Sequence, residues 1–411
     1  MARGMPEAVR IAVPLDPSTD APPVRPLAAV AAVPEAKPAE VCVTIYDAAA
    51  LPGRVVEDWA ALADAAAEPN SYAEAWFVLA SVETLGTPEG LRFVEVRRGA
   101  ELIGLIPLTV ERRYGRTPVP FVQNWRHHHH FLGTPLVREG EVETFWSALL
   151  QALDGAGWAP SFLHLLGLVE DGPVHRGLVA AAARIGRGCP LVYRETRALL
   201  EGVTDADAYY REAVRPKKRK ELRRLRHRLD ELGQVQVSAL GPGDALEPWC
   251  DAFLRLEAAG WKGEEGTALG CDPATEAFFR KTVAAARAAG KLQFLRLDVD
   301  GRAIAMLANF LAPPGGFSFK TAFDPDFARF SPGVLIQLEN LRLVERAGLA
   351  WMDSCAAEHH PMIDSLWSGR RRIVRVTVRL KGFRRGLVFA GCRALESGSA
   401  ALRRLARGRD G

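Results

Sequence analysis

The sequence predicts an α/β (α+β) protein built as two similar halves, each a mixed sheet flanked by helices. Stretches with strand-like alternation of β-branched residues and stretches with helical spacing follow one another along most of the chain. The stretch 96–107 recurs as 297–308, and each copy turns at a glycine, Gly99 or Gly301. A spacing of about 200 residues is too long for a solenoid, whose units run to ~50 residues, and indicates a duplicated domain. The length of 411 residues suits two domains of roughly 100–200 residues each.

The first half is expected to span residues 41–200, after a leader. Residues 1–40 are rich in Pro, Ala and Val without a periodic pattern, and we expect them to be disordered. Asn70 or Ser71 caps a helix that Gly86 ends. The expected elements are strand 41–46, helices 55–67 and 72–85, strands 91–96, 102–110 and 119–124, helix 142–153, strand 162–168, helix 174–185 and strand 191–196.

The second half, expected at residues 241–382, repeats this order. A basic helix, 209–232, occupies the linker 201–240 between the halves and ends at Gly233. A basic tail, 383–411, follows the second half. The expected elements are helices 248–259 and 273–289, strands 292–299, 303–311 and 317–323, helix 334–347, strand 349–353, a short helix 361–367 and strand 373–380.

Composition indicates a protein of the cytoplasm. Hydrophobic residues make up 48% and charged residues 25% of the chain, as in ordinary globular proteins. No run of about 18 apolar residues predicts a membrane-spanning helix, and the first residues lack the apolar segment of a secretion signal. The six cysteines form no C-x-x-C pair, which suits reduced thiols.

The most informative stretch is 317–350, where a strand, a tight loop and a long amphipathic helix follow one another. Ser331 is placed to cap this helix, Pro332 suits its first position and Gly348 ends it. A free helix N-terminus after a tight loop presents backbone N–H groups and partial positive charge, which favours a pyrophosphate. A plain capped helix without a ligand is the alternative.

Several stretches together resemble a known family. They are 256–263 with 266–269, the turn 300–305, the strand 320–324 and the loop 331–333. The hairpin 99–107 and the basic helix around 219–229 add to the likeness. The chain resembles the CelD-like (cellulose-biosynthesis type) acetyltransferases of the GNAT superfamily, which are related in architecture to FemAB-type transferases. The resemblance covers about residues 41–382 and is strongest over 256–353.

The resemblance implies a tandem GNAT (acyl-CoA N-acyltransferase) fold. It also implies that an acyl-CoA, acetyl-CoA or longer, binds as co-substrate at Arg329, Phe330, Ser331, Pro332 and Gly333, and that the acceptor lies in a groove between the halves. The first half has no Ser-Pro-Gly loop, and its equivalent stretch is 127–135. We therefore expect one donor site, in the second half.

Four residues are candidates for catalysis. Transfer of an acyl group to an amine needs a base for the amine proton and an acid for the leaving thiolate. Glu257 is the first candidate for the base, with a solvated helix carboxylate as the alternative. Lys320 lies in an aromatic strand, where burial requires a partner, and Asp324 is the expected one. The alternative is a structural ion pair. His359 and His360 follow the strand that ends near Asp353, close to where the resemblance places the acceptor, and His359 is the fourth candidate.

Four further residues are candidates for binding the acceptor: Trp261, Lys262, His128 and Asp353. Trp261 lines an acyl pocket or fills core, and Lys262 contacts a phosphate or an acidic acceptor. His128 belongs to a run of four histidines, 127–130. Adjacent residues of an extended segment point to opposite sides, so the four histidines cannot all face one metal. Two of them with a distant residue could ligate zinc, but we favour a role in lining the groove or in proton transfer and predict no metal. A solvated loop is the alternative.

Basic residues concentrate in two places. Ten of the residues from Arg211 to Arg228 are Lys or Arg, and the tail is again rich in Arg. The basic helix has no interleaved aromatic residues for stacking bases, which disfavours nucleic acid. Peripheral contact with an anionic inner membrane fits better, and co-sedimentation with anionic vesicles tests it.

The expected function is that of an N-acyltransferase. It moves an acyl group from acyl-CoA to a small-molecule, sugar or lipid amine in cell-envelope, polysaccharide or lipid biosynthesis. One alternative keeps the fold but takes aminoacyl-tRNA as donor, as FemAB-type enzymes do. The other is a non-catalytic scaffold of an envelope-synthesis complex, which would bind no CoA derivative.

Overall fold

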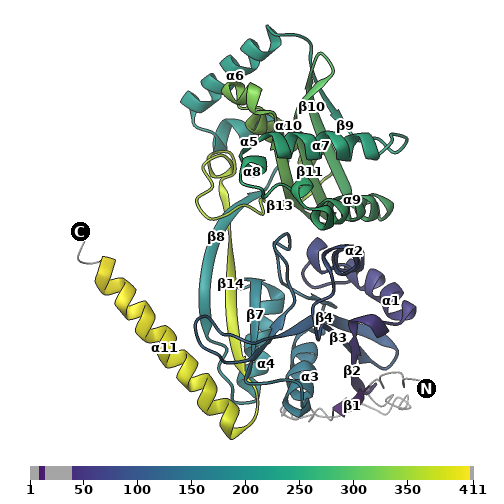
Figure 1. The fold of residues 1–411 in the computed structure, drawn as a ribbon, viewed down its shortest axis with the longest axis vertical. Helices are drawn as coiled ribbons and strands as arrows, with labels where there is room; N and C mark the ends of the chain where they lie inside the picture. Colours follow the sequence, from purple (N-terminus) through teal and green to yellow (C-terminus); the bar gives the residue numbers. More distant parts are fainter. Residues whose placement is uncertain (1–8, 14–38, 408–411) are drawn as a thin grey trace, which may run out of the picture.

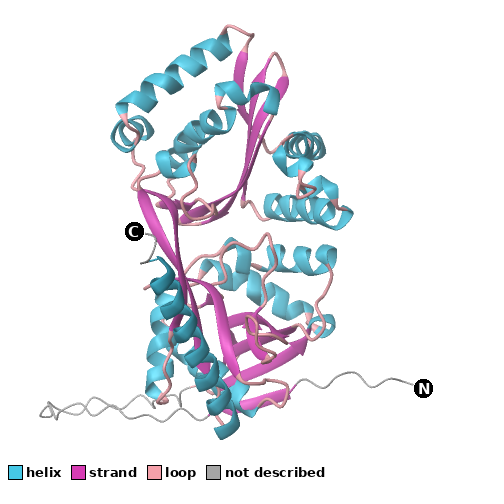
Figure 2. Ribbon diagram, turned by 60° about the vertical axis from the view of Figure 1, so that its left-hand side comes forward, coloured by secondary structure: helices cyan, strands magenta, loops and turns pink. Residues whose placement is uncertain are grey.

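The protein is elongated, and its two halves stack along the long axis (Figure 1). The computed structural model describes residues 9–13 and 39–407 of the chain. Helices lie on both sides of the strands in each half (Figure 2). This arrangement confirms the predicted α/β class with a mixed sheet.

Every element predicted for the first half is present. The predicted helix 72–85 begins as a short 3-10 turn, Ser71–Ala73, because the Asn70 side chain accepts a hydrogen bond from the Tyr72 N–H at 3.0 Å. The elements are β2 (Val41–Asp47), α1 (Gly53–Asp64), α2 (Ala75–Leu85), β3 (Arg92–Arg98), β4 (Glu101–Glu111), β5 (Phe121–Asn124), β6 (Leu136–Val137), α3 (Val142–Gly155), β7 (Phe162–Val169), α4 (Pro173–Arg184) and β8 (Leu191–Glu201).

The second half repeats the order, with additions that were not predicted. The strand β9 and the short helix α8 are new, and the expected helix 361–367 is only a 3-10 turn, Ile363–Ser365. The elements are α5 (Ala206–Ala213), α6 (Pro216–Asp230), β9 (Val235–Ala239), α7 (Glu247–Ala259), α8 (Trp261–Glu264), α9 (Pro273–Ala288), β10 (Leu292–Val299), β11 (Arg302–Ala312), β12 (Gly315–Phe323), α10 (Pro332–Arg346), β13 (Trp351–Asp353), β14 (Gly369–Arg379) and α11 (Phe383–Arg407).

The basic helix predicted over 209–232 is two helices. Pro216 has no N–H and disfavours helical backbone at Arg215, which adopts an extended conformation between α5 and α6. Positive charge does not surround α6 entirely, because Leu222, Leu225 and Leu229 are buried along one side of it. The helix therefore belongs to the fold of the second half.

The leader prediction is wrong for one segment. Val9–Val13 forms β1, which pairs antiparallel with β2. The alternating sequence Val-Arg-Ile-Ala-Val favours a strand at a free sheet edge, and this local pattern outweighs the composition around it. The rest of the predicted leader lies outside the described residues.

The last strand of each half completes the sheet of the other half. β8 pairs with β13 of the second half, and β14 inserts between β7 and β8. Each half supplies an antiparallel meander and one parallel pair, β5 with β7 or β12 with β13. Figure 1 shows β8 and β14 side by side along the junction. The predicted ranges 41–200 and 241–382 therefore do not enclose two separately closed sheets.

A buried ion cluster lies at this exchange. The Asp353 side chain is inaccessible to solvent, and its carboxylate oxygens lie 2.7 Å from Arg197 Nε and 3.1 Å from Arg371 Nη1. Burial alone would raise the pKa of Asp353, but the charges of Arg197 and Arg371 and the Cys355 N–H outweigh it and lower that pKa. Arg197 comes from β8 and Arg371 from β14, so one carboxylate joins both exchanged strands.

The halves also share a hydrophobic core. α2 of the first half packs against α9 of the second, and the rings of Phe77 and Phe278 meet edge to face with centroids 5.7 Å apart. Tyr72, inaccessible to solvent, contacts Phe310 and Phe317 across the same junction. At this contact the halves pack directly on each other.

The basic tail forms α11, which lies alongside the first half (Figure 1). Phe389 and Cys392 pack on the sheet beside Phe121 and Phe162, while Phe383 is 82% exposed. None of the described helices has the length and hydropathy needed to cross a bilayer. Peripheral membrane contact through this helix stays a prediction.

We predict that Arg197→Met lowers the free energy of unfolding by about 3–5 kcal/mol, because it removes one partner of a buried charge pair. Urea denaturation followed by circular dichroism measures the loss. The control is Arg372→Met, which removes a 56% exposed side chain that pairs with Glu170, and we expect a change within about 1 kcal/mol. Equal losses in the two variants would contradict a special role for the cluster.

Candidate active site

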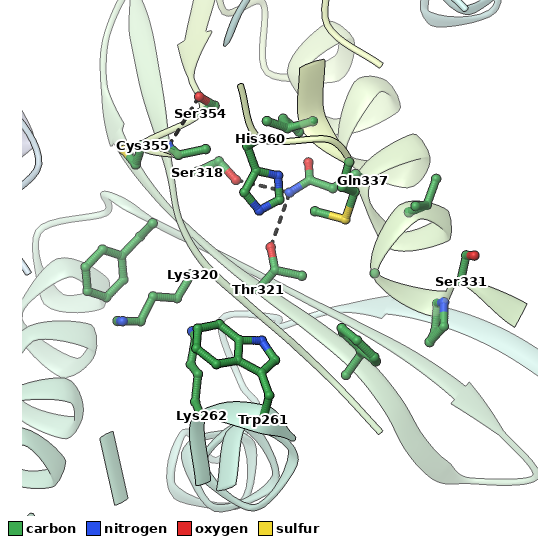
Figure 3. A pocket seen from close by; sticks show the side chains of 18 of the residues that line it. Trp261, Lys262, Ser318, Lys320, Thr321, Ser331, Gln337, Ser354, Cys355 and His360 are labelled. Atoms are coloured by element: carbon green, nitrogen blue, oxygen red, sulfur yellow. Dashed lines mark hydrogen bonds between the residues drawn. The ribbon is translucent and has the colours of Figure 1, made fainter. Parts of the chain in front are cut away.

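The parting of two parallel strands opens a cavity in the second half. β12 and β13 pair only over Gly315 with Trp351, Gly316 with Met352 and Phe317 with Asp353. Beyond this point β12 continues while the chain after Asp353 leaves the sheet. The cavity, about 500 Å³, lies between the residues that follow on each side (Figure 3).

Residues from both halves line the cavity, and the N-terminus of α10 faces it. Most come from β12, the N-terminal turn of α10 and the loop after β13, with two from α8 and one from the first half. They are Phe131, Trp261, Lys262, Ser318, Phe319, Lys320, Thr321, Phe323, Ala328, Ser331, Pro332, Gly333, Val334, Gln337, Ser354, Cys355, Ala356, His360, Met362 and Ile363.

Three of the five residues predicted to hold the donor line the cavity: Ser331, Pro332 and Gly333. Arg329 and Phe330 do not line it. The 3-10 turn Pro325–Phe330 directs the Phe330 ring into the core, and Arg329 lies over that ring at 4.8 Å. The predicted anion site therefore begins at Ser331.

The first turn of α10 presents an open backbone amide. Ser331 is the N-cap by position, as predicted, but it has left-handed φ and ψ of 54° and 50° and its side chain makes no capping hydrogen bond. The N–H groups of Val334 and Leu335 donate to the Ser331 carbonyl. Among the described residues none accepts a hydrogen bond from the Gly333 N–H.

Space is also available at Gly333. A Cβ atom built there would meet only side-chain atoms, Phe323 Cδ1 at 3.4 Å and Met362 Sδ at 3.6 Å. α10 is 15 residues long, so its dipole adds partial positive charge to this open end. An anion that enters the cavity lies beside a helix N-terminus whose Gly333 N–H has no acceptor among the described residues.

Polar groups continue along the cavity from this end. The Gln337 side chain donates hydrogen bonds to Ser318 Oγ at 3.2 Å and Thr321 Oγ1 at 3.3 Å. β12 rises about 3.3 Å per residue, so Ser318 and Phe323 lie roughly 17 Å apart along it. The cavity therefore has the length for an extended pantetheine arm.

Lys320 lies in the cavity wall with a buried ammonium group. Its Nζ lies 3.8 Å from Glu257 Oε1, and Lys262 Nζ donates to the same oxygen at 2.8 Å. Burial lowers the pKa of Lys320 to about 8; the Glu257 charge opposes this shift and Lys262 adds to it. Lys320 can therefore exchange a proton near neutral pH.

The prediction that Asp324 is the partner of Lys320 is wrong. Asp324 lies one residue past the end of β12, where its carboxylate accepts a hydrogen bond from the Asp326 N–H at 3.0 Å and pairs with Arg302. It caps the 3-10 turn that follows and lies outside the cavity.

Glu257 also lies outside the cavity lining. The side chain is buried at the end of α7, and its second oxygen accepts a hydrogen bond from the Leu269 N–H at 2.9 Å. Burial would raise the pKa of Glu257, but the charges of Lys320 and Lys262 outweigh burial and lower it. The geometry makes Glu257 the counter-ion that holds the two lysines.

His359 and His128 are exposed and do not line the cavity. The adjacent His360 lines it instead, and no described residue contacts its buried Nδ1 through a hydrogen bond. In the histidine run, His129 stacks on Phe278 with centroids 5.4 Å apart. Burial lowers the pKa of His127 and of His129 to about 3, so both are neutral.

Asp353 lies behind the cavity wall. It accepts a hydrogen bond from the Cys355 N–H at 2.9 Å, which holds Cys355 at a φ of 54° in the wall. Arg197 also donates to the Phe131 carbonyl at 2.8 Å. The Arg197–Asp353 pair thus positions two wall residues, one from each half.

Comparison with known proteins identifies the domain that contains this cavity. A family model described as Acetyltransferase (GNAT) domain matches residues 216–360. The second half carries a GNAT acetyltransferase domain. The match runs from the start of α6 to His360 and includes most of the cavity wall. The predictions of a GNAT fold and of an acyltransferase are confirmed, while the CelD-like subfamily stays a prediction. A search of curated proteins found no match to the chain.

Two solved structures are similar over most of the chain. FemX superposes with a TM-score of 0.52 at 11% identity, covering 77% of this chain and 95% of its own. The C-terminal domain of a candidate lysylphosphatidylglycerol synthetase from Agrobacterium fabrum superposes with a TM-score of 0.51 at 13% identity, covering 84% and 95%. At such identities the likeness concerns the fold alone.

The GNAT domain has an irregularity in β12 at the cavity. Lys320 pairs with Ala308 and Ser318 with Asn309, so Phe319 is an extra residue opposite the partner strand. A bulge leaves one residue out of the ladder, and Phe319 lines the cavity. Its backbone is a candidate for contact with the carbonyl oxygen of a thioester.

In the first half, the Asn124 side chain and a closely packed loop fill the position that corresponds to the GNAT cavity. β5 and β7 also part after two pairs, but Asn124 Nδ2 donates there to the carbonyls of Gly133 and Leu166. A Cβ atom at Gly133 would meet the Leu166 carbonyl oxygen at 1.9 Å, so the loop packs closely against β7. The same loop carries Phe131 to the GNAT cavity.

Several cavity residues were not predicted. Phe131 and Gln337 carry no local sequence signal beyond their positions beside predicted elements. Cys355 also lines the cavity. Its Sγ lies 3.1 Å from the Tyr72 hydroxyl, and burial raises the pKa of the thiol to about 12. The thiol therefore stays protonated at neutral pH and is a poor nucleophile.

Proposed function

We propose that the protein transfers an acyl group from acyl-CoA to an amine acceptor of the cell envelope, such as a sugar, polysaccharide or lipid amine. The observation that carries this proposal is the open N-terminus of α10, with the unpartnered Gly333 N–H, at one end of an elongated cavity in a GNAT domain. The donor pyrophosphate binds at Ser331–Gly333, and its arm follows β12. The similarity to FemX and to the synthetase domain is a similarity of fold, and it agrees with an acceptor from the cell envelope.

Lys320 is the proposed proton carrier. In its neutral form it accepts the proton from the attacking amine nitrogen as that nitrogen bonds to the thioester carbonyl carbon. The carbon–sulfur bond then breaks, and the resulting Lys320 ammonium donates the proton to the CoA sulfur. An ordinary thiol has a pKa of about 8.5, so transfer from a group near 8 is almost balanced in energy. Backbone N–H groups at the Phe319 bulge hold the oxyanion.

We predict that Lys320→Arg lowers kcat about 10²–10⁴-fold, because a guanidinium stays protonated and accepts no proton. Wild-type kcat/KM should rise with pH up to about 8, where Lys320 loses its proton. The titratable groups around it are Glu257 and Lys262, which are charged, and His129, which is neutral. Measuring both enzymes with the same acceptor removes the acceptor's own titration from the ratio of their rates. A ratio that is constant across pH would contradict the role of Lys320.

We predict that Gly333→Glu abolishes acetyl-CoA binding while the protein stays folded, since a carboxylate would lie where the pyrophosphate binds. Isothermal titration calorimetry measures binding, and circular dichroism measures folding. The control is Gly53→Glu at the first position of α1, another helix N-terminus with nothing within 4 Å of an added Cβ. If the affinity for acetyl-CoA is unchanged in Gly333→Glu, the donor binds at another place in the protein.

The same titration separates the alternatives. A donor of the aminoacyl-tRNA type predicts salt-dependent tRNA binding without affinity for CoA. A non-catalytic scaffold predicts no stabilisation by any CoA derivative, although a ligand at a hundredfold excess over its Kd adds about 2.7 kcal/mol.

A further inference from the structure

The two ends of the cavity carry different charges. At one end the N-terminus of α10 offers a backbone amide, and at the other Lys262 and Lys320 project from α8 and β12. Figure 3 shows both lysines away from Ser331, across the cavity. The helix end and the two lysines therefore lie on different sides of the cavity.

The wall of the cavity has no negative charge among the described residues. Its charged side chains are Lys262 and Lys320, and no Asp or Glu lines it. Glu257 lies behind them and is 4% exposed. An acceptor that enters as a bare ammonium would meet two cations without a carboxylate to offset them, which is unfavourable at low dielectric.

Lys262 has the capacity to bind an anion. An ammonium group has three N–H donors, and Lys262 uses one on Glu257. Its side chain is 27% exposed, so the head reaches the cavity from a partly solvated site. Trp261, the preceding residue, also lines the cavity, and it is 59% exposed. Its ring is therefore accessible to a bound molecule.

Close packing keeps Lys262 in this position. A Cβ atom at Gly263 would meet the Ala258 carbonyl oxygen at 1.8 Å, so α8 turns back sharply on the end of α7. Both ammonium nitrogens lie within 4 Å of the same Glu257 oxygen. Lys262 and Lys320 are thus near enough to contact two groups of one small molecule.

We infer that the acceptor amine carries an anionic group, a carboxylate or a phosphate, a few bonds from its nitrogen. Lys262 binds the anionic group, Trp261 covers the apolar or ring part, and the amine faces Lys320. This assignment rests on the proposed function and narrows its acceptor to acidic amines, such as amino acids or phosphorylated amino sugars.

Paired acceptors test the inference. With acetyl-CoA as donor, kcat/KM is measured for glucosamine 6-phosphate against glucosamine, and for β-alanine against β-alaninamide. We expect the anionic member of at least one pair to react about tenfold to a hundredfold faster, as for a hydrogen bond to a charged group. The phosphate pair and the carboxylate pair show which anion is used.

Variants connect the preference to Lys262. Lys262→Met should remove the preference and leave acetyl-CoA affinity unchanged, whereas Lys262→Arg should retain most of it. The matched control is Lys281→Met, which removes a 41% exposed lysine of α9 that pairs with Glu83. Binding of the same amines to protein saturated with CoA gives a second measurement that does not need turnover.

The outcomes separate this inference from the proposed function. Equal rates and equal binding within each pair, or the same loss for both members in Lys262→Met, would overturn the acidic acceptor. The proposal that acetyl-CoA binds at Gly333 would still stand in that case. Absence of acetyl-CoA binding would instead overturn the proposed function.

Discussion

The site depends on the place where β12 and β13 stop pairing. Phe317 and Asp353 form the last pair, and the cavity begins immediately after them. Asp353 cannot move from this place, because its carboxylate is buried between Arg197 and Arg371 on the two exchanged strands. A buried carboxylate without these partners would be costly, so the ion cluster fixes the point at which the strands part. The first half thereby sets the geometry of a cavity that lies in the second.

Electrostatics divides the cavity into two regions. The donor end uses backbone amides and a helix dipole, which need no mobile side chain to meet a phosphate. The other end uses lysines held by one buried carboxylate, Glu257, which lowers the cost of placing two ammonium groups side by side. His127 and His129 are neutral because burial opposes their protonation. Lys320 can exchange a proton near neutral pH, because burial lowers its pKa to about 8.

Much of the fold follows from local sequence. Alternation and helical spacing predicted nearly every strand and helix, and Ser331, Pro332 and Gly333 were predicted at the cavity from the signals of a helix start. The exchange of β8 and β14 was not predicted, because pairing between strands nearly 200 residues apart in sequence leaves no local signal. Pro216 did mark the break between α5 and α6, but the continuous run of basic residues obscured it.

The site residues were harder to predict for the same reason. Asp324 was expected to pair with Lys320 because it is nearby in the sequence, yet β12 ends one residue before Asp324 and the carboxylate caps a turn instead. His359 and His360 are indistinguishable by type, and only the loop conformation, with a φ of 61° at His359, turns one outward. Phe131 reaches the cavity from the other half, which depends on tertiary packing alone.

The central claim is that the first turn of α10 binds the phosphates of the donor. Hydrogen–deuterium exchange, with and without saturating acetyl-CoA, measures this at the backbone itself. The account predicts slower exchange in residues 331–337 and in the facing loop 354–363, with the equivalent helix start at residues 142–146 of the first half unchanged. Acetyl-CoA that binds but leaves residues 331–337 unprotected would contradict it.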